Sequence, residues 1–152
     1  MSKRVVGVIG GRQADDETLA RAERVGALLA QRGCVLVTGG LGGVMEAACR
    51  GARNAGGLTL GILPGAAVGE ANAYVDVAVA SGLGDARNAL IANTAEGFVA
   101  IGGSWGTLSE IAFALSRGKP VVSLGSFSAG LPVFTADTPE AAVERLLAAL
   151  AG

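Results

Sequence analysis

The feature that most constrains this chain is a short buried strand followed at once by a glycine-rich turn and a helix. The stretch FVAIGGSWGTLSEIAFALSRGKP predicts a strand over Phe98–Ile101, a turn over Gly102–Gly106 and a helix that ends at Gly118. A helix that begins directly after such a turn directs unpaired N–H groups and the positive end of its dipole at the strand's carboxyl end. The stretch therefore predicts an anion site. Its spacing matches neither the dinucleotide fingerprint nor the Walker lysine loop.

The rest of the chain repeats the alternation of short apolar runs with helical segments. Strands are predicted over Arg4–Ile9, Val35–Thr38, Leu58–Leu63, Tyr74–Val79, Phe98–Ile101, Pro120–Leu124 and Val133–Thr135. Helices are predicted from a cap at Asp15 or Asp16 to Gly33 and over 44–54, 85–95 and 138–151, with a loop over 66–73. Such alternation is typical of right-handed βαβ units. We therefore expect an α/β fold, Rossmann-like, with three α/β/α layers and a mainly parallel sheet.

Length and composition limit the classes of function. With 152 residues, 51% of them hydrophobic, and a net charge of −1, the chain is expected to form a single Rossmann-like domain over residues 1–152. No cluster of lysine and arginine appears, which disfavours nucleic acid as a partner. No apolar run reaches the roughly 18 residues of a membrane span, and a glycine turn interrupts the N-terminus before a signal-peptide core. We expect a cytoplasmic protein that binds no membrane.

The residues that usually form metal and covalent sites are scarce. Cys34 and Cys49 are too far apart for a C-x-x-C element, and the chain has no histidine, so no metal site is predicted and both cysteines are expected to be buried. Lys3 and Lys119 each precede a predicted strand. Ligands bind at the opposite, carboxyl ends of parallel strands. A pyridoxal phosphate enzyme is therefore disfavoured, and no cofactor is predicted.

Three glycine turns, Gly10-Gly11, Gly39–Gly43 and Gly102–Gly106, follow predicted strands and should lie at one edge of the sheet. Each has a purely structural alternative, because glycine also serves tight turns and close backbone packing. Three such turns at one edge, two of which open helices, favour a phosphate-sized anion. The candidate phosphate-binding residues are Gly10, Gly11, Gly39, Gly40, Gly42, Gly43, Gly103, Ser104, Trp105, Gly106 and Thr107.

Glu110 has two interpretations that the residues leave open. Thr107-Leu108-Ser109-Glu110 matches the capping box [ST]-x-x-[DE], in which the first and last residues bond to each other's backbone. That pattern explains Thr107 and Glu110 locally. A glutamate in the first turn of this helix would also lie beside the ligand crevice.

Arg87 and its neighbour Asn88 are candidates for contact with the ligand. If Asp85 caps the helix, Arg87 lies in the first turn, where the dipole disfavours a cation by about 0.3–1 kcal/mol. An anionic ligand would remove that conflict; the alternative is a solvated arginine or a pair with Asp85 or Glu46. Asn88 could bind the ligand or cap the backbone locally. Trp105 similarly could cover a ring of the ligand or seal the turn.

The motifs that carry these residues resemble those of a known superfamily. VTGGLGGVMEAA (37–48), ARN (86–88) and GGSWGTLSE (102–110) are similar to the motifs of the "lonely guy" type proteins, often labelled lysine decarboxylases. The superfamily includes cytokinin riboside 5′-monophosphate phosphoribohydrolases and a shorter branch of molybdenum cofactor carrier proteins. The likeness covers nearly the whole chain and implies the Rossmann-like fold.

The resemblance also implies roles for individual residues. The hydrolase pattern is P-G-G-x-G-T-x-x-E with an Arg-Lys pair before it, and Arg87 and Glu110 match its active-site arginine and glutamate. Gly102 stands in place of the proline, Ser104 in place of a glycine and Asn88 in place of the lysine. With these departures the chain looks more like the carrier branch, which puts hydrolysis in doubt.

Two functions follow from the resemblance. As a hydrolase, the protein would cleave the N-glycosidic bond of a nucleoside 5′-monophosphate to a base and ribose 5-phosphate, with Arg87 and Glu110 as catalytic residues. As a carrier, it would bind the molybdenum cofactor or a related phosphorylated pterin and pass it on unaltered. In both cases the partner is a phosphorylated small molecule. The superfamily, together with the apolar run Ile111–Leu115, also implies a homodimer or homotetramer.

Overall fold

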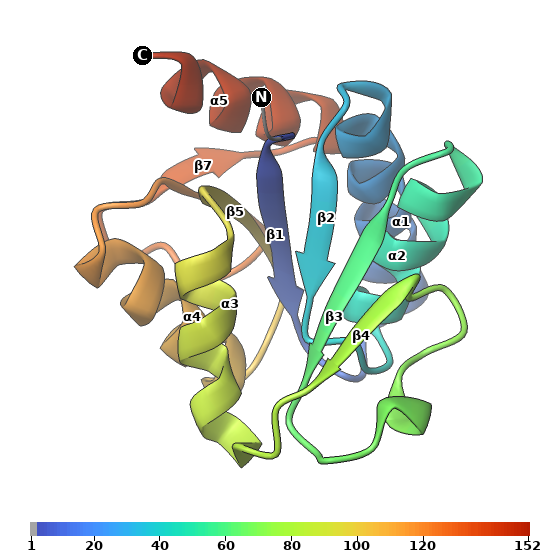
Figure 1. Cartoon of the computed structure of the whole chain (residues 1–152). Helices are drawn as coiled ribbons and strands as arrows, with labels where there is room; N and C mark the ends of the chain where they lie inside the picture. Colours follow the sequence, from blue (N-terminus) through green and yellow to red (C-terminus); the bar gives the residue numbers. More distant parts are fainter. Residues whose placement is uncertain (1–2) are drawn as a thin grey trace.

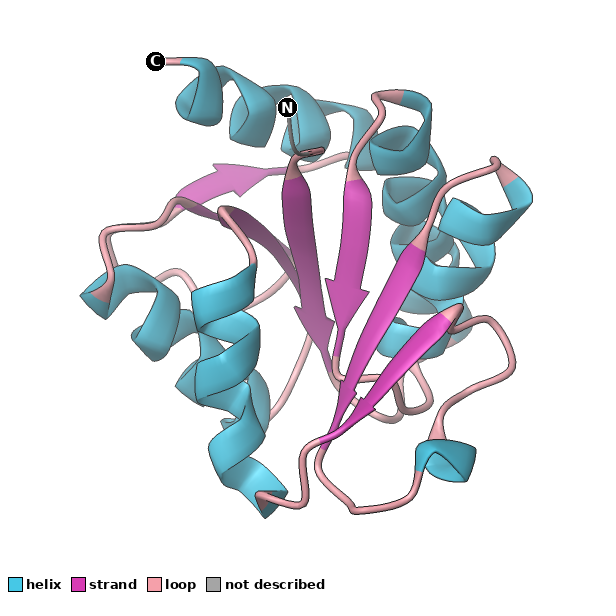
Figure 2. Ribbon diagram, viewed as in Figure 1, coloured by secondary structure: helices cyan, strands magenta, loops and turns pink. Residues whose placement is uncertain are grey.

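The computed structural model describes residues 3–152, and its centre is a seven-stranded sheet in which all neighbouring strands are parallel. The sheet confirms the predicted Rossmann-like α/β fold (Figures 1 and 2). Its order is β4-β3-β2-β1-β5-β6-β7. The strands are β1 Val5–Gly10, β2 Val35–Thr38, β3 Thr59–Leu63, β4 Val77–Ala80, β5 Gly97–Ile101, β6 Val121–Leu124 and β7 Phe134–Ala136.

The direction in which the sheet grows reverses between β1 and β5. Strands β2 to β4 add successively on one side of β1, whereas β5 to β7 add on the other. The register pairs Gly10 with Ile101, so β1 and β5 end at the same level. Loops that leave such a reversal diverge and open a crevice at the carboxyl ends of the two strands.

Helices cover both faces of the sheet (Figures 1 and 2). Helices α1 (Asp16–Gln31), α2 (Val44–Asn54) and α5 (Pro139–Ala151) pack on one face, and α3 (Arg87–Thr94) and α4 (Trp105–Ser116) pack on the other. Two short 3₁₀ turns, η1 (Val68–Glu70) and η2 (Gly84–Ala86), complete the chain. None of the helices between residues 3 and 152 combines the length and apolar character that a bilayer span requires.

The central strands are buried on both faces, so their side chains divide between two apolar layers. Along β5, Phe98 and Ala100 belong to the layer under α3 and α4, whereas Val99 and Ile101 belong to the layer under α1, α2 and α5. This is the alternation of a pleated strand. It explains why the strands read as continuous apolar runs rather than as an alternating pattern.

The structure also tests the predicted caps of two helices, one predicted loop and the predicted start of one strand. Asp15 caps α1 as predicted, because its side chain accepts from the Thr18 N–H at 2.8 Å. The prediction that Asp85 caps the third helix is wrong, since Asp85 lies within η2 and makes no cap bond. The predicted loop over 66–73 contains η1. The prediction of a strand from Tyr74 is also wrong, because β4 begins at Val77.

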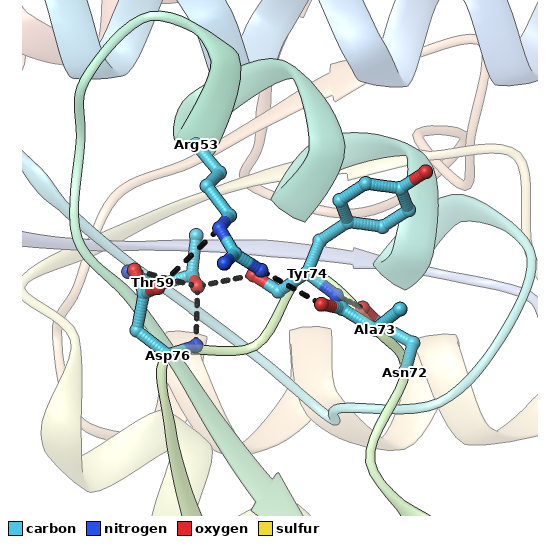
Figure 3. Close-up of polar contacts among 6 residues, drawn as sticks. All are labelled: Arg53, Thr59, Asn72, Ala73, Tyr74 and Asp76. Atoms are coloured by element: carbon cyan, nitrogen blue, oxygen red, sulfur yellow. Dashed lines mark hydrogen bonds and ion pairs between the residues drawn. The ribbon is translucent and has the colours of Figure 1, made fainter.

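A polar network explains why the chain turns at Tyr74 instead of extending (Figure 3). The buried Thr59 hydroxyl donates to the Tyr74 carbonyl at 2.5 Å and accepts from the Asp76 N–H at 2.8 Å. The Asp76 carboxylate accepts from the Thr59 N–H at 3.0 Å, and Arg53 donates to the Ala73 carbonyl at 2.8 Å. These contacts anchor the segment before β4 to the start of β3 and the end of α2.

The apolar run that supported an oligomer is largely covered within the chain. Ile111 and Ala114 are buried, and Phe113 and Leu115 are partly buried against the layer under α3 and α4. The homodimer or homotetramer stays a prediction. The exposed large apolar side chains lie elsewhere, at Leu58, Val68, Val77, Val79, Leu83 and Trp105.

Helices α1 and α2 approach each other so closely that their contact requires glycine. A Cβ built at Gly51 of α2 would lie 1.9 Å from the Glu23 carbonyl oxygen, and one at Gly26 of α1 would lie 2.0 Å from the Ala48 carbonyl oxygen. Because both obstacles are backbone atoms, relief would require the helices to move apart.

We expect Gly51→Ala to lower the free energy of unfolding by at least about 2 kcal/mol, because overpacking outweighs the gain of about 1 kcal/mol that alanine brings to a helix interior. Urea denaturation measures the change. Gly106→Ala in α4 is the matched control, since a Cβ there meets nothing within 4 Å. Equal stability of the two variants would show that the α1–α2 contact is not close.

We expect Thr59→Val to destabilise the protein by about 1–3 kcal/mol, because valine keeps the shape but leaves the Tyr74 carbonyl without its donor. Thr135→Val, at an exposed position in β7, should change stability by less than about 0.5 kcal/mol. Thermal unfolding of both variants tests the difference. A similarly small effect at Thr59 would count against the network.

Candidate functional site

A polar cleft lies where β1 and β5 end side by side. It has a volume of about 120 Å³, well above the roughly 10–15 Å³ that one water needs. The first and third glycine turns meet there, together with the starts of α3 and α4. Its walls are Gly10, Gly11, Arg12, Met45, Asp85, Arg87, Asn88, Ser104, Gly106, Thr107 and Glu110.

The third glycine turn leads directly into α4, whose first turn faces the cleft. Ser104 is the N-cap, and its N–H donates to the Thr107 hydroxyl at 3.3 Å. The predicted capping box is therefore wrong by one turn: Thr107 is the residue that bonds back to the cap, and Glu110 lies further along the helix. Backbone N–H groups in the first turn of a helix have no acceptor within the helix. That of Gly106, which lines the cleft, is available to an anion there.

The second glycine turn supports the cleft from beneath and does not line it. Gly43 has a φ of +65°, and a Cβ there would lie 2.3 Å from the Arg12 carbonyl carbon and from the Gly11 oxygen. The Val44 N–H donates to the same Gly11 oxygen at 3.0 Å. The turn therefore holds the backbone of Gly11 and Arg12 in place. Gly39, Gly40 and Gly42 likewise lie outside the cleft wall.

Asn72 holds the second turn from its other side. Its N–H donates to the Gly40 carbonyl at 2.8 Å, and its side-chain amide donates to the Leu41 carbonyl at 2.9 Å. Figure 3 places Asn72 beside the network of Thr59 and Asp76. The segment before β4 thus connects the end of α2 with the turn that supports the site.

Arg87 forms the buried floor of the cleft. Its side chain donates to the Ile62 carbonyl at 2.9 Å, to the Gly39 carbonyl at 3.4 Å and to the Asn88 side chain. Among residues 3–152 no carboxylate lies within ion-pair distance of it, so the suggested pair with Asp85 or Glu46 does not form. Burial lowers the pKa of Arg87, an effect that the charge of Glu110 opposes. The buried guanidinium therefore lacks an anionic partner within the described part of the chain.

Glu110 lies in the same cleft and is 7% exposed. Burial raises the pKa of its carboxyl from 4.5 to about 8, although the nearby charge of Arg87 acts in the opposite direction. Most Glu110 side chains are therefore protonated and neutral at pH 7. A neutral carboxyl can donate a hydrogen bond to an anion, which a carboxylate would repel.

The remaining predicted site residues differ in their relation to the cleft. Asn88 joins α3 to α4 through a bond of 3.0 Å from its amide to the Ser109 hydroxyl. Gly103 lines a neighbouring hollow instead. Trp105 is 82% exposed at the start of α4 and lines no wall of the cleft, so it does not seal the turn.

Three residues of the cleft wall were not among the predicted ligand residues: Arg12, Met45 and Asp85. Arg12 directly follows Gly10-Gly11, so its place after a strand was a usable signal. Met45 and Asp85 depend on how α2 and η2 are oriented, which the spacing of motifs does not report.

The lysines and cysteines lie away from the cleft wall. Lys119 donates to the carbonyls of Ala92 and Asn93 at 2.7 and 2.9 Å, and so binds the carboxyl end of α3. Cys34 and Cys49 are free and buried, as predicted, and burial raises the pKa of both thiols. Within residues 3–152 no three metal-ligating side chains gather into a cluster.

Comparison with known proteins assigns the chain to a family. Residues 3–147 match the family model described as the SLOG cluster4 family. The chain belongs to this family. An uncharacterized relative from Archaeoglobus fulgidus is 46% identical over 140 residues, which are 91% of each chain.

Solved structures similar to this SLOG cluster4 protein include proteins named for the molybdenum cofactor. The molybdenum cofactor binding protein of Rippkaea orientalis is 38% identical over 99% of both chains, with a TM-score of 0.93. The molybdenum cofactor carrier protein of Chlamydomonas reinhardtii is 36% identical over 99% of this chain and 100% of its own, with a TM-score of 0.89. These matches bear out the likeness to the carrier branch, whereas kinship with the "lonely guy" hydrolases stays an expectation.

We expect the raised pKa of Glu110 to make stability depend on pH. A carboxyl that holds its proton more tightly in the folded state stabilises it below the unfolded pKa, and this contribution is lost as the pH rises through about 8. Between pH 5 and 8 the free energy of unfolding should fall by roughly 2–5 kcal/mol. In Glu110→Gln this part of the dependence should be absent. Urea denaturation of both proteins between pH 5 and 8 measures this difference. Parallel pH profiles of the two proteins would contradict the raised pKa of Glu110.

Proposed function

We propose that this protein binds the molybdenum cofactor, or a related phosphorylated pterin, in the cleft between β1 and β5 and carries it without changing it. The observation that carries the proposal is the match over 99% of both chains to a molybdenum cofactor binding protein. The chemistry of the cleft supports the same reading.

The cleft offers a phosphoryl group both charge and hydrogen-bond donors. The first turn of α4 presents the N–H group of Gly106 and the positive end of the helix dipole. Arg87 supplies a positive charge that no residue of the described chain neutralises by an ion pair. Glu110, neutral at pH 7, adds a donor where an ionised carboxylate would repel the ligand. Binding of a phosphate is therefore favoured by every group at the floor of the cleft.

The protonation of Glu110 also argues against the hydrolase. Cleavage of an N-glycosidic bond passes through an oxocarbenium-like state, which an ionised carboxylate stabilises and a neutral carboxyl does not. Asn88, where the hydrolases have a lysine, is engaged with Arg87 and Ser109. One observation favours the enzyme as second candidate: a carboxyl with a pKa near 8 suits a general acid at neutral pH.

If the protein is a carrier, natively purified protein should contain the intact ligand. The protein is produced in two otherwise identical strains, one that makes the molybdenum cofactor and one that does not, and both samples are weighed by native mass spectrometry. We expect an additional mass only from the first strain, released on denaturation as an unaltered phosphorylated pterin. Two samples of equal mass would contradict the carrier.

The hydrolase is tested separately on a panel of nucleoside 5′-monophosphates. Because Glu110 is neutral at pH 7, we expect no release of free base above that of Glu110→Gln, measured by chromatography. Release of base by the unmodified protein and its loss in Glu110→Gln would establish the enzyme instead.

A further inference from the structure

Arg12 differs from the other arginines in having no partner. The sequence contains ten arginines. Within residues 3–152, nine of them have a carboxylate, a hydrogen-bond acceptor or an aromatic ring as partner, whereas Arg12 has none. An arginine side chain carries five donors and a permanent charge. That of Arg12 is available to a group from outside the chain.

The backbone that carries Arg12 is nevertheless held firmly. Gly43 packs against its carbonyl, and the neighbouring Gly11 carbonyl accepts from the Val44 N–H at 3.0 Å. Three residues later Asp15 caps α1. A fixed backbone with an exposed, unpaired side chain is the arrangement expected of a residue that contacts a ligand from the solvent side.

Arg12 lies at the junction of two hollows. It lines the polar cleft, whose floor is Arg87, and also an adjoining hollow of about 450 Å³ walled by Gly11, Arg12, Gln13, Gly103 and Ser104. A phosphoryl group in the cleft would therefore leave the rest of its ligand to occupy the larger hollow. Arg12 is placed where these two parts of the ligand join.

The charge of the cleft suits an anionic group. Arg12 and Arg87 supply two positive charges, and the positive charge of Arg12 contributes, after burial, to the lowered pKa of Arg87. Of the two carboxyl groups in the wall, Glu110 is mostly neutral at pH 7, which leaves Asp85. The balance is about one positive charge before any ligand binds.

We propose that Arg12 is a specificity-determining residue that binds the ligand's phosphoryl group opposite Arg87 and selects phosphomonoesters over the same molecules without phosphate. The inference rests on the proposed function, because it concerns the ligand of the same cleft. It assigns to Arg12 the recognition of the phosphate and to the adjoining hollow the organic part of the ligand.

The test uses a matched pair of probes, 6-hydroxymethylpterin phosphate and 6-hydroxymethylpterin, whose binding is measured by calorimetry. A hydrogen-bonded charge contributes about 1.5–3 kcal/mol, so Arg12→Ala should weaken binding of the phosphorylated probe by about tenfold or more. Binding of the other probe should not change. Arg12→Lys, which keeps the charge but not the planar fork, should recover part of the loss.

Gln13→Ala is the control, because Gln13 lines the adjoining hollow without a charge. It should leave the preference for the phosphorylated probe intact. If the unmodified protein prefers that probe and Arg12→Ala prefers it equally, the role of Arg12 is overturned while the proposed function stands. If the unmodified protein binds neither probe, or both equally, the role of Arg12 is overturned, and the native mass measurement decides the proposed function separately.

Discussion

The pairing of β1 with β5 is the contact on which the site depends. Strands that are far apart in the sequence lie side by side, and their register brings Gly10 level with Ile101. Two glycine turns, which would otherwise serve separate strand-to-helix connections, therefore face each other across one cleft. A shift of two residues in this register would move one turn along the strand axis by about 6–7 Å and separate the α4 N-terminus from Arg12. The parallel sheet therefore determines the spacing of the groups that face the ligand.

The same burial that stabilises the sheet sets the charge of the cleft. Arg87 at the start of α3 and Glu110 in the second turn of α4 both line the cleft, and both are 7% exposed. A guanidinium keeps its charge under these conditions, whereas a carboxyl gives its charge up. Arg87 and Glu110 thus form a cation beside a neutral donor. The cleft consequently attracts an anion.

Much of this arrangement can be predicted from the sequence. The apolar runs and the glycines between them predict the strands and the layers of the fold, and they place Arg87 and Glu110 near one edge of the sheet. Contacts between distant segments could not be predicted from the sequence: the Thr59 hydroxyl holds the chain at Tyr74, and Gly43 packs against the backbone of Arg12. The capping box failed for a related reason. Ser104 and Thr107 satisfy the start of α4 one turn earlier, which leaves Glu110 without a backbone role.

Because Glu110 does not cap α4, its carboxyl can distinguish a carrier from an enzyme that has the same fold. A capping glutamate would be ionised and held by backbone N–H groups, whereas the Glu110 carboxyl lies deeper along α4, where burial raises its pKa against the opposing charge of Arg87. Its proton is then sensitive to what occupies the cleft: a bound phosphate disfavours ionisation further, because like charges repel. Binding of the proposed phosphorylated ligand would therefore reinforce the protonated state of Glu110 that favours it. Hydrolysis would need the opposite response, a carboxylate in the occupied site, so the geometry that improves retention of a phosphate works against cleavage of the bond beside it.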